Sequence, residues 1–399
     1  MQPHSSVVLA FVAAFGAAAP CASALPSRAP AHAIQEKAAV LDQVFVRSKR
    51  DRSVAPIAAR VERNDLDKVV VSAGGKETNY DGALVVRINF GDAPPSFRDG
   101  LSYLERGLYS DAVAQLRSAA GDGSARAVVK AVAQLETAEA LLRWGASEPA
   151  RFVEAASEAQ AFLSSNAGHR ETPRARALLG RAQWLAGKPA EAGATLKALW
   201  AELKGAEATA GYNVADCLHA GIHAARALAD SKDTLGAREI YASLESQAGP
   251  LAAGAGADDP VKLIYQNIAD EATLGAGFVD LAGGQAKQAL TFFQNKVNAL
   301  NTESSHALRF GARLGLGEAL LAEGRLRDAW LHLARAAALD PQDADRAARA
   351  LVKLAECYSK LEDSDARLQA CSRVKAVLNT AGGTPAAVRA RQLQKELGC

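Results

Sequence analysis

The hydrophobic pattern of the chain changes character near residue 93. Between residues 43 and 90, apolar and β-branched residues form short runs separated by polar or glycine-containing turns, and such runs predict β-strands. From Ser96 to the C-terminus, apolar residues recur at the spacing of amphipathic helices. Between the two regions, GDAPP (91–95) favours a loop, because glycine and successive prolines interrupt regular structure. The strand-like runs are VFV (44–46), VAPIAARVER (54–63), KVVVSA (68–73) and ALVVRINF (83–90).

The strand-like region, residues 43–92, is expected to form a small β-barrel domain. Four or five short strands in about fifty residues are best accommodated by a closed or half-closed barrel. Their spacing resembles that of Sm-like and SH3-like barrels, and this similarity is one of pattern, without a diagnostic motif.

The helical region shows its clearest internal unit in GEALLAEGRLRDAWLHLARAAALDP, residues 317–341. Gly317 lies within a first predicted helix, where the missing side chain lets a neighbouring helix approach closely, and Gly324 supplies a turn. Ala329 and Leu333 then lie on one face of a return helix. The unit is therefore predicted to be a helix–turn–helix hairpin.

Three further segments carry the same order of glycine, turn glycine, alanine and large apolar residue. This pattern resembles the tetratricopeptide repeat (TPR), whose unit of about 34 residues is a helix–turn–helix. The copies are not in strict tandem, because their first glycines are 80, 97 and 40 residues apart, and hairpins without the signature are expected at 127–163 and 215–244. The copies are Gly100, Gly107, Ala112 and Leu116; Gly180, Gly187, Ala192 and Leu196; Gly277, Gly284, Ala289 and Phe293; and, more loosely, Ala355, Tyr358 and Ala366.

The resemblance implies a mainly α protein, with a TPR-like α-solenoid of helical hairpins over residues 96–399 preceded by the small β-barrel. Stacked hairpins of this kind form a superhelix with a concave face. In TPR proteins the first helix of each hairpin supplies most partner contacts, which implies a protein or peptide in a concave groove, without cofactor or catalysis. For Trp184, an alternative interpretation is that its side chain packs against the next hairpin. By position, the implied contact residues are Arg174, Arg181, Trp184, Glu271, Phe278, Leu314, Glu318 and Leu321.

The N-terminus has the pattern of a signal peptide, residues 1–24. Residues 7–19 are apolar and uncharged, and Ala22-Ser23-Ala24 provides a cleavage site of small residues. A tail at residues 25–42 follows, with proline, alanine and no periodicity. No later run is long and apolar enough to span a bilayer. The sequence therefore predicts export to the periplasm or cell envelope of a bacterium, as a soluble protein after cleavage.

Charge and composition argue against a nucleic-acid binder. Lys and Arg total 46 against 44 for Asp and Glu, whereas nucleic-acid-binding proteins concentrate a basic excess. A local basic cluster, Arg47, Lys49, Arg50 and Arg52, has two interpretations: a solvated turn, which we favour because Asp51 interrupts it, or a contact for an anionic envelope polymer.

The cysteines and histidines offer two further candidates. Export would leave Cys217, Cys357, Cys371 and Cys399, and Cys357–Cys371 is the expected disulfide, with buried free thiols as the alternative. His219 and His223 are four residues apart on a predicted helix near Cys217, which suggests a metal site. The position next to His219 is alanine instead of the glutamate of a hydrolytic zinc motif, so we favour a structural role over metal binding.

Overall fold

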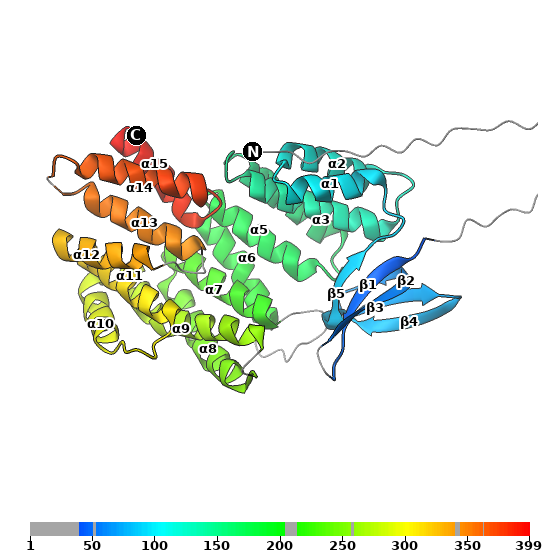
Figure 1. Ribbon diagram of the computed structural model, residues 1–399, viewed down its shortest axis with the longest axis horizontal. Helices are drawn as coiled ribbons and strands as arrows, with labels where there is room; N and C mark the ends of the chain where they lie inside the picture. The colour runs from blue at the N-terminus through cyan, green and yellow to red at the C-terminus, as the bar shows by residue number, and fades with distance from the viewer. Residues whose placement is uncertain (1–39, 51–52, 204–213, 257–258, 340–343, 362) are drawn as a thin grey trace, which may run out of the picture. The chain divides into compact units, whose positions relative to one another are not determined.

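The computed structural model describes residues 40–50, 53–203, 214–256, 259–339, 344–361 and 363–399. The predicted signal peptide, nearly all of the predicted tail at 25–42, and Arg52 lie outside these residues. Within the described ranges, five strands come first and fifteen α-helices follow (Figure 1). The strands are β1 (Asp42–Arg47), β2 (Val54–Asn64), β3 (Lys68–Ala73), β4 (Lys76–Asp81) and β5 (Val85–Asn89), with a 3-10 turn, η1 (Gly82–Leu84), before β5. The helices are α1 (Pro95–Glu105), α2 (Tyr109–Gly121), α3 (Ala127–Trp144), α4 (Arg151–Ser165), α5 (Thr172–Leu185), α6 (Pro189–Leu203), α7 (Val214–Asp230), α8 (Thr234–Gly254), α9 (Pro260–Ala282), α10 (Ala286–Asn298), α11 (His306–Ala322), α12 (Leu326–Ala338), α13 (Ala344–Tyr358), α14 (Ala366–Thr380) and α15 (Pro385–Leu397).

The strands form an antiparallel sheet in the order β4-β3-β2-β1-β5. The first half of the long strand β2 pairs with β1, and its second half pairs with β3. A barrel is not confirmed, because no pairing between β4 and β5 closes the sheet within the described residues. A side chain from the helical region takes part of the free edge instead, since Arg170 Nη1 donates to the carbonyl oxygen of Val85 at 2.9 Å.

A buried carboxylate ties the sheet to the start of α3. Asp42 is fully buried and accepts hydrogen bonds from the backbone N–H groups of Val61 (2.8 Å) and Gly91 (2.9 Å). Arg126, the residue before α3, donates to Asp42 at 2.7 Å and to Asp92 at 2.5 Å. The charge of Asp42 is therefore satisfied from both the sheet and the helical region, which fixes the sheet against α3.

The loop between α4 and α5 provides a second attachment. Leu66 N–H donates to the carbonyl of Gly168 at 2.8 Å, and Arg170 N–H donates to the carbonyl of Asn64 at 2.9 Å. The Asn64 side chain also lies 3.2 Å from Nε2 of His169. These bonds place the residues just before α5 beside the β2–β3 turn.

The packing predicted for the glycine-bearing hairpins is confirmed. A Cβ atom at Gly317 would lie 2.6 Å from Cγ of Leu333, so only glycine allows α12 to approach α11 this closely. Gly324, at the turn between these helices, has a φ of 75°, a conformation that glycine adopts without steric cost. The same close approach joins Gly100 to Leu116, Gly180 to Leu196 and Gly277 to Phe293, and the turn glycines Gly107, Gly187 and Gly284 also have positive φ.

The remaining helices follow the same hairpin scheme without the signature. The segments predicted at 127–163 and 215–244 are the pairs α3–α4 and α7–α8, and α13 and α14 form the last pair before α15. Each helix packs against the next along the chain, and alternate helices also contact one another, which is the arrangement of a stacked array. The fold is a TPR-like α-solenoid preceded by a small antiparallel sheet.

The predicted Cys357–Cys371 disulfide is wrong. Cys371 of α14 is bonded to Cys399, with Cα atoms 5.6 Å apart, while Cys357 and Cys217 are buried free thiols. Cys357 packs in the core formed with α11 and α12, and its Sγ lies 3.2 Å from the carbonyl oxygen of Leu326. The two cysteines of the predicted pair therefore face different neighbours, Cys357 the preceding hairpin and Cys371 the C-terminal segment.

The C-terminal helices also contact the α3–α5 region, far away in sequence. Arg181 Nη2 of α5 lies 3.6 Å from Oδ1 of Asp345 in α13 and 3.3 Å from the carbonyl oxygen of Gly383, to which it donates. Arg391 of α15 donates to the carbonyl of Ala146, just after α3, at 3.3 Å. We call these contacts the α5–α15 closure.

Candidate functional site

The first helices of successive hairpins form an inner row. Helices α3, α5, α7, α9, α11, α13 and α15 contact one another in series, and the predicted partner residues lie on three of them, α5, α9 and α11. This inner row divides into two parts with different surroundings. One part is filled by side chains of the chain itself, and the other borders a groove.

Ion pairs fill the part of the row formed by α7, α9, α11 and α13. Arg226 of α7 forms a two-pronged pair with Glu271 of α9, at 2.6 and 2.7 Å. Arg349 of α13 forms an equivalent pair with Glu318 of α11, both bonds at 2.6 Å. Arg346 adds a third cation 3.7 Å from Glu271. Glu271 and Glu318 were expected to contact a partner, and the structure instead buries both against arginines of neighbouring helices.

The predicted apolar contact residues are buried as well. Trp184 is buried, which agrees with the alternative that it packs against the next hairpin. Its indole N–H donates to Asp230 of α7 at 3.0 Å. Phe278 lies beneath the Arg349 guanidinium, 4.9 Å from the ring centroid, while Leu314 and Leu321 belong to the core around α11. Six of the eight predicted contact residues are therefore enclosed by the chain, and for Glu271, Phe278 and Glu318 the covering side chains are Arg346 and Arg349 of α13.

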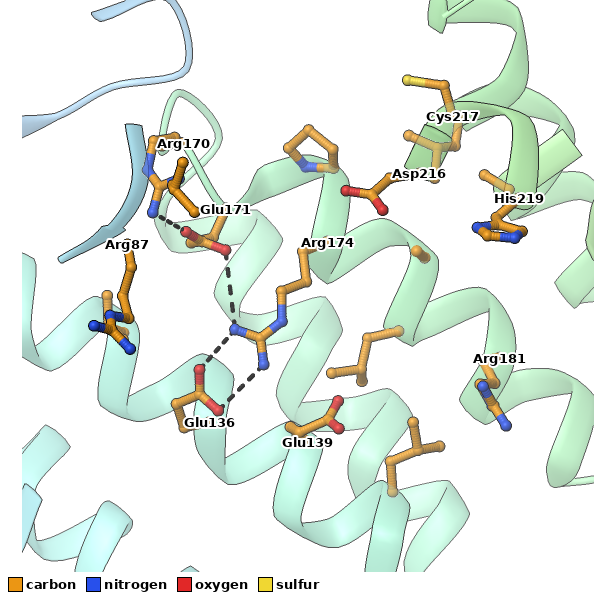
Figure 2. A pocket seen from close by; sticks show the side chains of 18 of the residues that line it. Arg87, Glu136, Glu139, Arg170, Glu171, Arg174, Arg181, Asp216, Cys217 and His219 are labelled. Carbon is orange, nitrogen blue, oxygen red and sulfur yellow. Dashed lines mark hydrogen bonds and ion pairs between the residues drawn. The ribbon is translucent and has the colours of Figure 1, made fainter. Parts of the chain in front are cut away.

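The other two, Arg174 and Arg181, are partly exposed and border a groove of about 1230 Å³, which the buried Trp184 also lines. Its walls come from β5, α3, α5 and α7. We call this space the β5–α5 groove. Figure 2 shows its charged side chains: Arg87 from β5, Glu136 and Glu139 from α3, Arg170, Glu171, Arg174 and Arg181 from α5 and the loop before it, and Asp216 and His219 from α7.

Arg174 is the centre of a linked set of charges in this groove. It donates to both carboxylate oxygens of Glu136, at 2.6 and 3.2 Å, and lies 3.9 Å from Glu171, which in turn pairs with Arg170 at 2.5 Å (Figure 2). Burial opposes the charge of Arg174, but the carboxylates of Glu136 and Glu171 outweigh it, so the pKa of Arg174 is raised. The guanidinium is a fixed positive charge, with 41% of its side chain still exposed.

Arg181 marks the opposite end of the groove, where α5 meets the C-terminal helices. Its side chain is 43% exposed although it contacts Asp345 and Gly383. Arg174 and Arg181 are seven residues apart on one helix, so they lie on the same face two turns apart, about 10 Å along the axis. The groove therefore presents two arginines in a row along α5.

The proposed metal ligands are not brought together. Cys217 is buried on α7 and packs against Leu199 and Ala220, whereas His219 is exposed to the groove. Burial, with a further contribution from Asp216, raises the pKa of the Cys217 thiol to about 12. Among the described residues, no cluster of three His, Cys, Asp or Glu side chains is placed to hold a metal ion.

The basic cluster before β2 is spread over different surroundings. Lys49 pairs with Asp81 at 3.3 Å, and Arg50 N–H donates to Ser48 Oγ at 3.2 Å. Arg47 is exposed and borders the β5–α5 groove. The cluster is thus not one patch, since one of its arginines belongs to the groove.

Sequence reasoning did not identify Glu136 or Arg87 as groove residues. Glu136 lies on a hairpin that lacks the glycine signature, so it had no repeat position from which a role could be assigned. Arg87 lies on a strand whose place beside α3 and α5 depends on the Asp42–Arg126 and Asn64–Arg170 contacts, which join residues far apart in sequence. The only local signal was the arginine in the apolar run ALVVRINF.

Comparison with known proteins gives structural likeness alone. A tetratricopeptide repeat protein from Parabacteroides merdae is 12% identical, with 72% of this chain and 94% of that chain covered and a TM-score of 0.47. NprR, solved in complex with its cognate peptide NprX, is 12% identical over 75% of this chain and 83% of its own, with a TM-score of 0.42. A putative kinesin light chain of Podosopora anserina with TPR-like repeats is 18% identical over 52% and 94%, with a TM-score of 0.35. No family model and no curated protein matches the sequence.

In the part of the chain that the structure describes, no helix combines the length and the apolar character needed to cross a bilayer.

Proposed function

We propose that this protein is a non-enzymatic interaction module that binds a protein or peptide partner in the β5–α5 groove. The observation that carries this proposal is the division of the inner row. Arg174 and Arg181 border the groove with more than 40% of each side chain exposed, whereas the other predicted contact residues are buried, including Trp184, which also lines the groove. A concave, charged space between rigid elements is the usual setting of a binding site.

The chemistry of the groove favours binding over catalysis. Its charges are largely paired with each other, as in Arg174–Glu136 and Arg170–Glu171, which fixes their positions and leaves no strong nucleophile beside a base. The Cys217 thiol is protonated at neutral pH, because its pKa is about 12. Fixed, oriented charges provide specificity for a partner of complementary charge.

Site-specific photocrosslinking tests the proposal. A photoreactive amino acid replaces His219, which is exposed and borders the groove, or Gln294, which is exposed on α10 outside it. Both full-length variants are irradiated in cells of the native host, and crosslinked products are identified by mass spectrometry. We expect a discrete product from position 219, absent from position 294, that weakens at least tenfold when Arg181→Glu is added. Products of equal yield from both positions would contradict groove binding.

We further propose that the protein acts after export to the cell envelope. The apolar run at residues 7–19, the Ala22-Ser23-Ala24 site and the Cys371–Cys399 disulfide support this, since structural disulfides persist in oxidising compartments. Protein isolated from the native host is expected to begin at Leu25 and to yield a peptide pair linked through Cys371 and Cys399 under non-reducing conditions. An uncleaved N-terminus with reduced cysteines would contradict export.

A further inference from the structure

Strand β5 exposes its backbone edge to the β5–α5 groove. It ends the sheet order and pairs only with β1 among the described strands, so one row of its N–H and C=O groups faces away from the sheet. Residues 82–88 border the groove consecutively. A strand that turned one face to the groove would contribute alternate residues, so a consecutive run indicates that the edge itself faces the space.

The edge of β5 differs from the opposite edge of the sheet. Strand β4, KETNYD, carries Lys76 and Glu77 and is largely exposed, as is usual for an edge protected by charge against further pairing. On β5, the side chain of Val86 is 47% exposed and Ile88 is half-buried, so the edge is partly apolar. An apolar, groove-facing edge is suited to an added strand.

Two arginines lie on one face of the sheet beside this edge. Arg87 is directly opposite Phe45 in the β1–β5 register, and its guanidinium lies 4.2 Å from the centroid of the Phe45 ring. Arg47 is two residues beyond Phe45 on β1, so it lies on the same face. Both arginines are exposed and border the groove, and neither forms an ion pair with any described residue.

The glutamates that α3 contributes to the groove are already neutralised. Glu136 is paired with Arg174, and Glu139 is paired with Arg143 at 2.7 Å. The positive charge of Arg47 and Arg87 therefore lacks a carboxylate partner within the described chain. A ligand that lies along β5 gains most if it brings that carboxylate.

We propose that the edge of β5 binds an extended segment of a partner protein as an additional strand, with carboxylate side chains at alternate positions facing Arg87 and Arg47. The proposal rests on the groove function proposed above and specifies its partner. Backbone hydrogen bonds to β5 hold the segment, and the alternation of its side chains selects it. Because Arg170 already occupies the carbonyl of Val85, residues 86–89 of β5 remain for pairing, a length of about 14 Å.

A second copy of this chain fits the same edge poorly. In a two-fold antiparallel pairing of β5 with itself, the central residue Arg87 lies opposite the Arg87 of the other copy. Like charges directly opposite each other destabilise a strand pair. Charge complementarity therefore favours an acidic segment over self-association.

Designed peptides test the inference with the full-length protein. The probe is a fluorescein-labelled heptapeptide that alternates valine and glutamate, compared by fluorescence anisotropy with one in which lysine replaces glutamate. Two N-methylated forms follow, one methylated at every glutamate nitrogen and the other at every valine nitrogen. Successive N–H groups of a strand point to opposite edges, so we expect one form to bind at least tenfold more weakly and the other within threefold of the parent.

Protein variants provide the matched control. Arg87→Glu is expected to weaken binding of the glutamate peptide at least tenfold, whereas Lys76→Glu on the opposite edge leaves it within twofold; circular dichroism verifies that both variants fold. Equal effects of the two methylation patterns, or equal binding of the lysine peptide, would overturn strand addition. If no peptide binds while position 219 still crosslinks a partner, strand addition fails and the groove function stands. Concentration-dependent dimerisation abolished by Arg87→Glu would instead identify a second copy as the occupant.

Discussion

Arg181 of α5 and Asp345 of α13 lie 3.6 Å apart, although seven helices, α6 to α12, separate α5 from α13 along the chain. In a stacked helical array each repeat ordinarily contacts only its neighbours. The Arg181–Asp345 pair therefore joins parts of the array that sequence distance would keep independent.

If the α5–α15 closure holds the C-terminal helices in place, removing it should make their amide hydrogens exchange faster. Replacing both Arg181 and Arg391 by alanine removes hydrogen bonds to Gly383 and Ala146, so amide hydrogen exchange in α15 is expected to accelerate at least tenfold. Exchange in α9 to α12, which have their own cores, is expected to stay within twofold. The control is Arg327→Ala, at an exposed position on α12. Unchanged exchange in α15 would show that these contacts do not hold the C-terminal helices.

The Asp42–Arg126 contact predicts a large effect on stability. Arg126→Ala leaves the fully buried Asp42 carboxylate without its cation, which is expected to lower the free energy of unfolding by about 3 kcal/mol. Arg117→Ala, which breaks an exposed pair with Glu158, is expected to cost less than about 1 kcal/mol. Urea denaturation followed by circular dichroism measures both, and similar costs for the two variants would refute the role given to Asp42.

The close packing at Gly317 predicts that a glycine-to-alanine substitution changes the free energy of unfolding in opposite directions at two helical glycines. Gly317→Ala places a methyl group against Leu333 and is expected to lower the free energy of unfolding by about 1 to 3 kcal/mol. Gly121→Ala, in the last turn of α2 where no atom outside the adjoining residues lies within 4 Å of the new Cβ, is expected to raise it by up to about 0.5 kcal/mol. Thermal unfolding of both variants distinguishes the two signs, and stabilisation by Gly317→Ala would disprove the close helix approach.

The half-buried His169 predicts acid sensitivity at the junction of sheet and helices. The pKa of His169 is lowered from 6.5 to about 4, chiefly by burial and in smaller part by Arg170, against the opposing effects of Glu171 and Asp65. Between pH 6.5 and 4 the unfolded chain binds the proton more readily, so stability falls as the pH is lowered through this window, by up to about 3 kcal/mol. Below pH 4 this contribution is constant.

The contribution of His169 is isolated by comparing the free energy of unfolding of the wild type with that of the His169→Gln variant. The free energy of unfolding is measured for both proteins at several pH values from 7 to 4. The difference between them is expected to change over that range in favour of the glutamine variant as the pH falls. Parallel curves would show that His169 does not titrate with the predicted shift.

The helical hairpins could be predicted from the sequence because their signals are local. The pairs Gly317–Leu333 and Gly180–Leu196 are each sixteen residues apart, so one hairpin contains both the cause and the effect of the packing. Four of the five strands could be predicted for the same reason, whereas β4, KETNYD, has no apolar run and was not among the predicted strands. The predicted barrel was not confirmed, because closure depends on what pairs with β5, and Arg170 of a distant loop takes the carbonyl of Val85.

The site was less predictable, because it depends on contacts between distant hairpins. Repeat position correctly assigns Glu271 and Glu318 to the inner row, but only the placement of α13 determines that Arg346 and Arg349 cover them. The disulfide prediction was wrong for the same reason. Cys357 and Cys371 lie on adjacent helices, but Cys371 is bonded to Cys399, whose position depends on α15.

The contact of α5 with α13 and the segment leading to α15 has a consequence for how this array can change. An open solenoid can gain or lose a hairpin in its middle and keep every remaining interface. Here, an inserted hairpin between α5 and α13 would rotate Asp345 and Gly383 away from Arg181, and a deleted one would drive α15 into α5. The number of repeats between these helices is thereby fixed by geometry, so this protein can diversify through the residues of its groove but not through its length.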